Sequence, residues 1–434
     1  MIVNGNGHKG QTRRIRLRLI AKSMKIISHL GLMLLLVLSS WRSQNPGTQV
    51  SSDAWREDLR HLARKLPRRH VNAFHTVSRE TFDAEVARLD AAVPHLNGDD
   101  VLVGFMTVVA LIGDGHTHLD LPPNSLRYPV EMQWFGDELR VIAAQAPYHS
   151  AVGARVLAIG SIPIDEVINR TIQLVPRCEN DGRTRFTATV QLTTPEVLHG
   201  LGVIGDRANA PFALETATGE TATVTFSPAR FAGFSSWRLV MGDTPPLYLQ
   251  RLMETWWTEF LPADQTVYFS FTAYPADAEF RERAAELARL LDESHARRLV
   301  IDLRRNQGGD LTRFRQLLLP LIKARPSINR KGGLFVITGP GTFSAATVNA
   351  LDLRNEANAI LVGSPTGMRP NHYGEHGEFR LPNSGFRISY STQYYRFGAD
   401  TDSAVVPDRR VEPTGTEFRA GRDPVMEWIL SRKD

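Results

Sequence analysis

The stretch that decides the fold is a pair of strand-to-helix turns, Asp302-Leu-Arg-Arg-Asn-Gln-Gly-Gly-Asp310 and Ile337-Thr-Gly-Pro-Gly-Thr-Phe-Ser-Ala-Ala346. Each turn follows a nearly continuous apolar run, at 298–303 and at 334–338, and each precedes a segment with helical spacing. Strands that alternate with helices predict a parallel or mixed sheet with crossover helices. The two glycines of the first turn would let backbone N–H groups face a ligand with no side chain in the way.

Ser344 lies near the start of the helix expected at 343–356, and two alanines follow it. Its hydroxyl would lie at the positive end of that helix, with the backbone N–H of Ala345 facing an oxyanion. A serine near a helix start is also a common cap, so its position alone does not indicate catalysis. The pattern Gly-x-Ser-x-Gly is absent, which excludes the nucleophile elbow of the α/β-hydrolases.

The rest of the chain divides by pattern into further segments. Apolar residues recur at helical spacing in the first part after residue 50, short strand-like runs with turn residues dominate the middle, and strand–helix alternation follows. We expect a multidomain α/β (α+β) protein with a helical domain at 51–125, a β-rich domain at 126–235 and the core at 236–434. A targeting segment is expected at 1–45.

The charge is concentrated in that first segment. Residues 1–45 hold 8 basic and no acidic residues, and without them the chain has 43 basic against 46 acidic residues, a net charge of −3. Because a nucleic-acid footprint needs a basic face on the folded domain, the high pI does not indicate nucleic-acid binding.

Residues 1–45 have the layout of a secretory signal peptide. Basic residues end at Lys25, an uncharged apolar stretch runs over 26–38, and Ser39 and Ser40 follow. The stretch is shorter than the roughly 20 residues that span a bilayer. We expect an exported protein, periplasmic or extracellular, that contacts the membrane only if this segment stays on as an anchor. Cys178 is the only cysteine, so no intrachain disulfide and no thiol metal cluster is possible.

Taken together, the two turns and Leu361-Val-Gly-Ser-Pro-Thr-Gly367 resemble the catalytic core of the C-terminal-processing (tail-specific) serine peptidases, in the histidine-containing branch of the tricorn core. Upstream, Gly113-Asp-Gly-His-Thr117 is similar to a motif that precedes the middle domain of that family, and 152–165 is similar to a divergent PDZ segment. The resemblance implies a crotonase/ClpP-like ββα core, a PDZ-like middle domain, and a serine endopeptidase that acts on protein or peptide substrates without a cofactor.

The resemblance also implies a set of site residues. Ser344 would be the acyl-accepting nucleophile, and the N–H of Ala345 with that of Gly308 or Gly309 would form the oxyanion hole. Many members use a lysine about 25 residues after the serine, but the only lysine after Ser344 is Lys433. Arginine stays protonated and cannot act as a base, so the Arg369 of that region does not replace it.

A histidine base is the alternative that the family offers. His116 of the Asp-Gly-His-Thr motif is the expected base, since an imidazole pKa of roughly 6.5 suits neutral pH. Three other histidines remain open as the base: His118, His372 and His376. A structural role for His116, bonded to Asp114 or Thr117, is the other interpretation.

The resemblance also implies an acid that orients the imidazole about 58 residues after the serine, which corresponds to Asp402. Other acids close enough in sequence to compete are Asp400, Glu375 and Glu378.

Three rival functions remain. The same core serves as a carrier of apolar ligands in retinoid-carrier-like domains, and as an acyl-transfer enzyme in the crotonases. The third is a metal site, because alternating residues on one strand face could bind a cation: Asp114, His116, His118 and Asp120.

Overall fold

The computed structural model describes residues 50–432, with gaps at 123–124, 177–178, 217, 231–236, 240–244 and 252–253. Residues 50–434 form one compact unit. The expected targeting segment and Cys178 lie outside the described residues. None of the helices in the described ranges combines the length and the hydropathy that a bilayer span requires.

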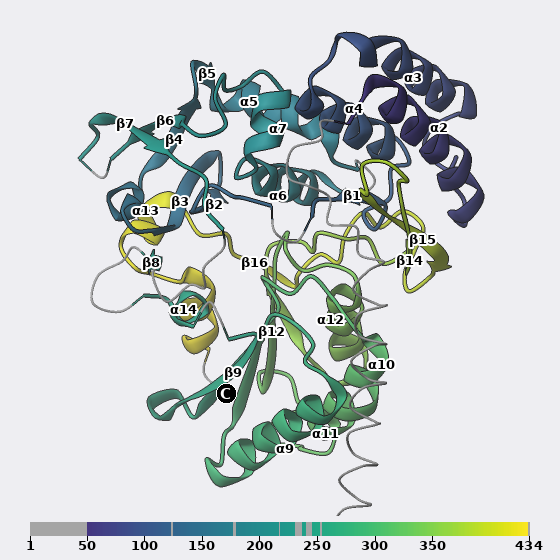
Figure 1. The fold of residues 1–434 in the computed structure, drawn as a ribbon. Coiled ribbons are helices and arrows are strands. Elements are labelled where there is room, and N and C mark those ends of the chain that lie inside the picture. The colour runs from purple at the N-terminus through teal and green to yellow at the C-terminus, as the bar shows by residue number, and fades with distance from the viewer. Residues whose placement is uncertain are drawn as a thin grey trace, which may run out of the picture. The chain divides into compact units, whose positions relative to one another are not determined.

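The first part is a helical layer of α2 (Ser52–Arg69), α3 (Arg79–Ala92) and α4 (Gly98–Ala110). The helices begin at side-chain caps, which satisfy otherwise free N–H groups: Ser51, Ser78 and Asn97. A hairpin from late in the chain packs on this layer (Figure 1): β14 (His372–Arg380) and β15 (Arg387–Tyr395). Strand β1 (His118–Asp120) pairs antiparallel with β15 and completes a three-stranded sheet.

The middle part is an antiparallel sheet with the strand order β2-β3-β4-β6-β7, in which β5 pairs with β4 and β8 with β3. Its strands are β2 (Val130–Phe135), β3 (Glu138–Gln145), β4 (Arg155–Ile159), β5 (Ile162–Pro163), β6 (Ala210–Glu215), β7 (Thr221–Phe226) and β8 (Trp237–Leu239). Its helices are α5 (Ile164–Thr171), α6 (Asp181–Gln191) and α7 (Pro195–Gly200). Strand β2 is an edge strand, and the side chains of Trp134 on β2 and Thr189 on α6 are hydrogen-bonded at 2.7 Å.

The core is a six-stranded sheet with the order β16-β13-β12-β11-β10-β9, parallel except for β9. Its strands are β9 (Trp256–Leu261), β10 (Thr266–Phe271), β11 (Arg298–Asp302), β12 (Leu334–Thr338), β13 (Ile360–Gly363) and β16 (Arg409–Arg410). Its helices are α8 (Leu247–Gln250), α9 (Asp277–Glu293), α10 (Leu311–Arg313), α11 (Leu319–Lys323), α12 (Ala345–Glu356), α13 (Gly415–Arg419) and α14 (Pro424–Leu430). The prediction of a mixed α/β fold is confirmed.

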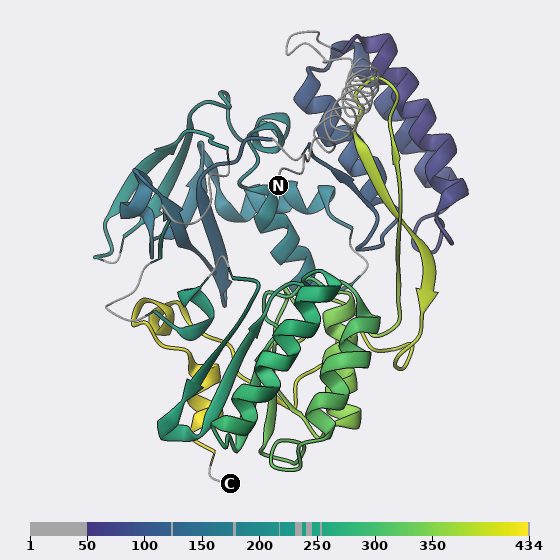
Figure 2. The ribbon, with the colours of Figure 1, turned by 60° about the horizontal axis from the view of Figure 1, so that its bottom comes forward.

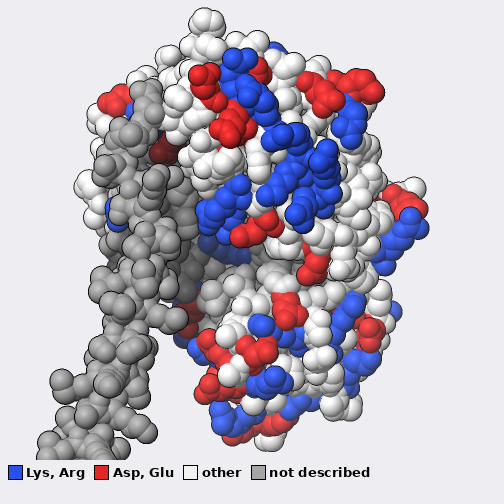
Figure 3. Space-filling view, turned by 45° about the vertical axis from the view of Figure 1, so that its right-hand side comes forward, with Lys and Arg blue, Asp and Glu red and all other residues white. Residues whose placement is uncertain are grey.

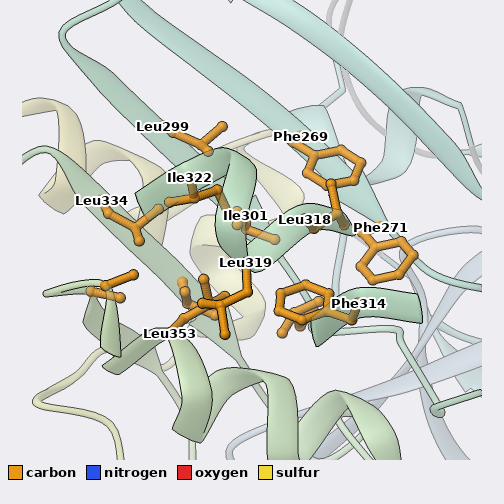
Figure 4. Close-up of a cluster of buried hydrophobic side chains, with 14 of the residues drawn as sticks. Phe269, Phe271, Leu299, Ile301, Phe314, Leu318, Leu319, Ile322, Leu334 and Leu353 are labelled. Atoms are coloured by element: carbon orange, nitrogen blue, oxygen red, sulfur yellow. The ribbon is translucent and has the colours of Figure 1, made fainter. Parts of the chain in front are cut away.

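Helices cover both faces of this sheet, which explains why its strands read as continuous apolar runs. On one face, Phe269, Ile301 and other strand residues pack against α9 and the helices between 311 and 356, as Figures 2 and 4 show. On the other face, Tyr268 and Phe335 pack against α14. The helical segment that follows the first turn is not continuous, because a π-helical turn at 314–318 separates α10 from α11.

The domain boundaries expected at residues 125 and 235 remain a prediction. One hairpin from the C-terminal part packs against the N-terminal helices. Although β14 and β15 belong to the C-terminal part of the chain, Phe379 and Ile388 lie in the same hydrophobic cluster as the helices α2–α4. The surface mixes both signs of charge: Figure 3 shows basic and acidic side chains side by side over one face, with a group of basic ones in its upper half.

Candidate active site

Ser344 sits at the carboxyl edge of the core sheet, between the end of β12 and the start of α12. Its backbone has φ 51° and ψ −130°, a conformation that costs a residue with a Cβ on the order of 1–3 kcal/mol. The hydroxyl does not cap α12, although Ser344 is the N-cap residue. The interpretation of Ser344 as a helix cap is therefore wrong, and its hydroxyl is free to bond elsewhere.

The hydroxyl bonds instead to an imidazole from far upstream. Nε2 of His116 lies 2.9 Å from Oγ of Ser344, although 228 residues separate them in sequence. His116 belongs to the loop between α4 and β1, and its ring packs on Phe343 with 4.7 Å between centroids. The side chain of His116 is 7% exposed, so this contact is largely shielded from water.

Two of the other candidate histidines lie near this pair. The ring centroids of His372 and His376 are 6.1 Å and 5.9 Å from that of His116. Burial, with some repulsion from His116, lowers the pKa of His372 to about 4. Burial also lowers the pKa of His376. His118 points elsewhere, since its Nε2 pairs with Asp120 at 3.1 Å.

The low pKa of His372 predicts a loss of stability in mild acid. Between about pH 6.5 and pH 4 the unfolded chain binds a proton at this ring and the folded chain does not, so stability falls as the pH decreases through that window. The loss approaches about 3 kcal/mol at pH 4. Denaturant unfolding at pH 7 and pH 4.5 should show a clearly smaller drop for His372→Phe than for the wild type. Equal drops in both proteins would contradict the prediction.

The sequence expectation for the orienting acid was Asp402. Its exposed carboxylate accepts a hydrogen bond from the backbone N of Ala399, 3.2 Å away in its own loop. The competing acids also bond elsewhere: Asp400 to Asn371, Glu375 to the hydroxyl of Tyr395, and Glu378 to Arg387. Among the described residues, the carboxylate within 4 Å of the His116 ring is that of Asp114, whose Oδ1 lies 3.8 Å from Nδ1. The role of Asp402 stays a prediction.

The turn at 302–310, which we call the glycine turn, lies close to Ser344. A Cβ on Gly308 would lie 2.5 Å from Cβ of Ser344 and 3.0 Å from the backbone N of Ala345, so only glycine fits. The N–H of Gly308 donates to Oδ1 of Asn306 at 2.8 Å and is already engaged. Among the described residues, the N–H groups of Gly309 and Ala345 have no acceptor within hydrogen-bond distance, and a first helical residue such as Ala345 has none in its own helix. Of the two glycines expected for the oxyanion hole, this geometry favours Gly309.

Hydrogen bonds tie the two turns to each other and to the C-terminal helix. The backbone N of Phe343 donates to the carbonyl of Asn306, and the hydroxyl of Thr342 donates to that of Leu303. The partly buried guanidinium of Arg304 joins Asp302 to Asp423, the cap of α14. These contacts hold the glycine turn and Ser344 at a fixed separation.

The described residues do not group into a metal site. The four residues considered for a cation divide into separate contacts. Asp114 bonds to His70 and Thr117, His116 contacts Ser344, and His118 pairs with Asp120. In the described ranges, no three His, Cys, Asp or Glu side chains lie close enough together to hold a metal ion.

A cavity of about 850 Å³ lies beside the turn that leads to Ser344. The edge strand β2 and helix α6 line it on one side, with Trp134 and Arg185 among their contributions. The turn at 339–341 and the end of β13 line it on the other. Ser344 itself does not line the cavity, although residues 339–341 of the turn that leads to it do.

Comparisons with known proteins find a matching family model and solved structures of similar fold. Residues 266–411 match the model of Peptidase family S41. Mature CPAF complexed with lactacystin aligns with a TM-score of 0.59 and 13% identity over 87% of this chain and 97% of that one, and the CPAF S499A mutant with 0.60 and 11% over 88% and 99%. A photosystem II D1 C-terminal processing protease aligns with a TM-score of 0.41 and 13% identity over 83% and 93%. No curated protein matches.

Residues 266–411 thus form a peptidase family S41 domain, and this domain supports a serine-type peptidase with protein or peptide substrates. The matched region contains Ser344 and both turns. His116 and Asp114 lie outside it, so their roles depend on the geometry alone.

Proposed function

We propose that this chain, through its peptidase family S41 domain, is an endopeptidase that cleaves peptide bonds by way of an acyl-enzyme on Ser344, with His116 as general base. The observation that carries the proposal is the 2.9 Å contact between Nε2 of His116 and Oγ of Ser344. No lysine follows Ser344 before Lys433, so an imidazole is the base that the chain offers. The strained backbone of Ser344 is a further support, since such strain is concentrated at functional sites.

The reaction would follow from this geometry. As Oγ of Ser344 attacks the scissile carbonyl carbon, Nε2 of His116 accepts the hydroxyl proton. The negative oxygen of the tetrahedral intermediate accepts hydrogen bonds from the N–H groups of Ala345 and Gly309, each worth on the order of 3 kcal/mol in the barrier. The protonated imidazole then gives its proton to the leaving amine, and water hydrolyses the ester with the same base.

For substrate capture we propose the PDZ-like middle region. Strand β2 is an open edge, and together with α6 it borders the 850 Å³ cavity beside the active-site turn. An extended peptide can add to such an edge through main-chain hydrogen bonds. This geometry and the divergent segment at 152–165 support a peptide-binding role for residues 126–235.

We also propose that the protein is exported and works in the periplasm or outside the cell. The support is the sequence of residues 1–45, with its basic start, apolar stretch and small-residue end.

A fluorophosphonate probe tests the nucleophile directly. Because the probe needs an activated serine, the wild type should be labelled on the peptide that contains Ser344, and labelling should be lost in Ser344→Ala. A Ser431→Ala variant, altered at the exposed end of α14, is the matched control and should label like the wild type. A chelator should change neither labelling nor peptide hydrolysis.

The rival functions predict other results. A folded wild type that is neither labelled nor active on unfolded protein, yet binds an apolar ligand, would be a carrier on the same fold. Activity confined to acyl-CoA thioesters would point to a crotonase-type enzyme.

A further inference from the structure

A network of buried polar side chains, formed by His70, Asp114 and His116, adjoins the contact between His116 and Ser344. The side chains of His70 and Asp114 are fully buried, and that of His116 is 7% exposed. They come from the end of α2 and from the loop that follows α4. This network lies in low-dielectric surroundings, where interactions between charges are stronger than in water.

One side-chain nitrogen of this network has no hydrogen-bond partner among the described residues. Nδ1 of His116 is buried and unpaired. When Nε2 accepts the proton of Ser344, Nδ1 must carry the ring proton, and an unpaired buried donor costs roughly 1–3 kcal/mol. Oδ1 of Asp114 lies 3.8 Å away, longer than a hydrogen bond. Catalytic contacts are often long in a free enzyme and shorten when substrate binds.

Hydrogen bonds hold the carboxylate of Asp114 in place beside His116. The backbone N of Asn72 donates to Nδ1 of His70 at 3.0 Å, so His70 carries its proton on Nε2 and donates it to Oδ2 of Asp114, also at 3.0 Å. The hydroxyl of Thr117 donates to the same oxygen at 2.5 Å. The backbone N of His116 donates to Oδ1 at 3.0 Å. These donors fix both carboxylate oxygens and leave Oδ1 beside the imidazole.

The pKa of Asp114 agrees with an ionised carboxylate. Burial alone would raise it, but the neighbouring imidazole of His116 and the hydrogen bond from His70 outweigh burial and hold the pKa of Asp114 well below its ordinary value. Asp114 therefore stays negative at neutral pH and can stabilise an imidazolium beside it.

Other charged or titratable groups face this part of the site. Glu179 lies near Gly115, but its Oε2 accepts the backbone N–H of Arg369. The guanidinium of Arg183 lies over Phe343, and the rings of His372 and His376 are about 6 Å from that of His116. None of these is a carboxylate within 4 Å of Nδ1 among the described residues.

We infer that Asp114, held in place by His70, is the acid that orients the His116 imidazole and stabilises its cation, in place of Asp402. The inference rests on the proposed function and names further positioning residues for the same reaction. Neither residue touches the substrate. Asp114 acts through His116, and His70 acts through Asp114.

Asp114→Asn is the first test. It should lower kcat on a quenched peptide by on the order of 10³-fold, because the amide cannot stabilise the imidazolium and favours the wrong tautomer. KM should stay within about twofold, since the carboxylate does not touch the substrate. The acidic limb of the profile of kcat/KM against pH should move to lower pH, because the imidazole loses the negative charge that favours its protonation. A merely structural role would not shift this limb.

A pair of His70 variants tests the second link. His70→Phe removes the donor to Asp114 and should lower kcat on the order of 10-fold. His70→Gln places an amide N–H near the former Nε2–H and should restore most of that loss. If Asp114→Asn does not fold, as judged by circular dichroism, the same shift of the acidic limb is measured in His70→Phe.

The controls separate the inference from the proposed function. Ser344→Ala must be inactive; an active Ser344→Ala would refute the proposed function itself. Asp402→Asn and Glu179→Gln should keep wild-type kcat within about threefold and leave the acidic limb unmoved. If Ser344→Ala is inactive while Asp114→Asn behaves like the wild type, or while Asp402→Asn or Glu179→Gln shows the drop and the shift, the assignment of Asp114 is wrong and the peptidase mechanism stands.

Discussion

Ser344→Ala should lower kcat for peptide hydrolysis by on the order of 10⁶-fold, the largest effect expected of any single substitution in this chain. The variant loses the atom that forms the acyl-enzyme, and no other hydroxyl is described within hydrogen-bond distance of His116 Nε2. The fold should lose only about 1 kcal/mol, because the hydroxyl caps no helix and the one described bond that is lost is the bond to Nε2 of His116. Hydrolysis of a quenched peptide and chemical unfolding measure the two quantities.

Ser344→Gly is the matched control, because it removes the same hydroxyl and also the Cβ. Glycine adopts a φ near 51° with little strain, so this variant should be as inactive as Ser344→Ala but more stable than it by about 1 kcal/mol. Residual activity in either variant beyond a trace would contradict the role of Ser344. Equal stability of the two would show that the backbone of Ser344 stores no strain.

Much of the core was predictable from the sequence, for a physical reason. Strands β11, β12 and β13 are buried on both faces, so each appears as a short apolar run between turn residues. The turns that follow them are rich in glycine and small residues, because the backbone of the glycine turn approaches Ser344 too closely for a Cβ at Gly308. In these strands and turns the sequence pattern therefore reflects the packing directly, and the fold of the core can be predicted from it.

The hairpin of β14 and β15 was not predicted, because little in its sequence shows that it is a strand pair. Polar and aromatic residues occupy much of β14, and the hairpin residues that enter the hydrophobic cluster of the helical layer are few: Phe379, Leu381, Ile388 and Tyr390, with Phe386 packed against it. That cluster joins residues from opposite ends of the chain, which no local pattern reveals.

The candidate site divides in the same way. Ser344 and His116 lie in short motifs of small residues, and the structure brings them within hydrogen-bond distance. His70 carries no such signal, since it ends an amphipathic helix 44 residues before its partner Asp114. Asp114 lies in the same short motif as His116, but only the fold shows that its carboxylate lies beside the imidazole. Counting 58 residues from the serine led to Asp402, whose loop folds back onto its own backbone.

His116→Ala is the second large effect, with an expected loss in kcat on the order of 10⁵-fold. Without the imidazole, Oγ of Ser344 keeps its proton and attacks the carbonyl only weakly. The acidic limb of the rate profile should disappear, because the group that titrates in it has been removed. The double variant Ser344→Ala/His116→Ala should be no slower than Ser344→Ala alone, since residues that act as a unit are not additive.

The neighbouring imidazoles provide the controls for that experiment. His376→Ala and His372→Phe should each keep kcat within about tenfold of the wild type, because their rings lie about 6 Å from that of His116. If His372→Phe or His376→Ala lowered kcat as much as His116→Ala does, that histidine would be the general base instead of His116. A Ser344 that stays reactive in His116→Ala would mean that its hydroxyl is activated by the helix start and the strained turn rather than by a base. The peptidase would then depend on the positive end of α12, and its rate would show no histidine limb at any pH.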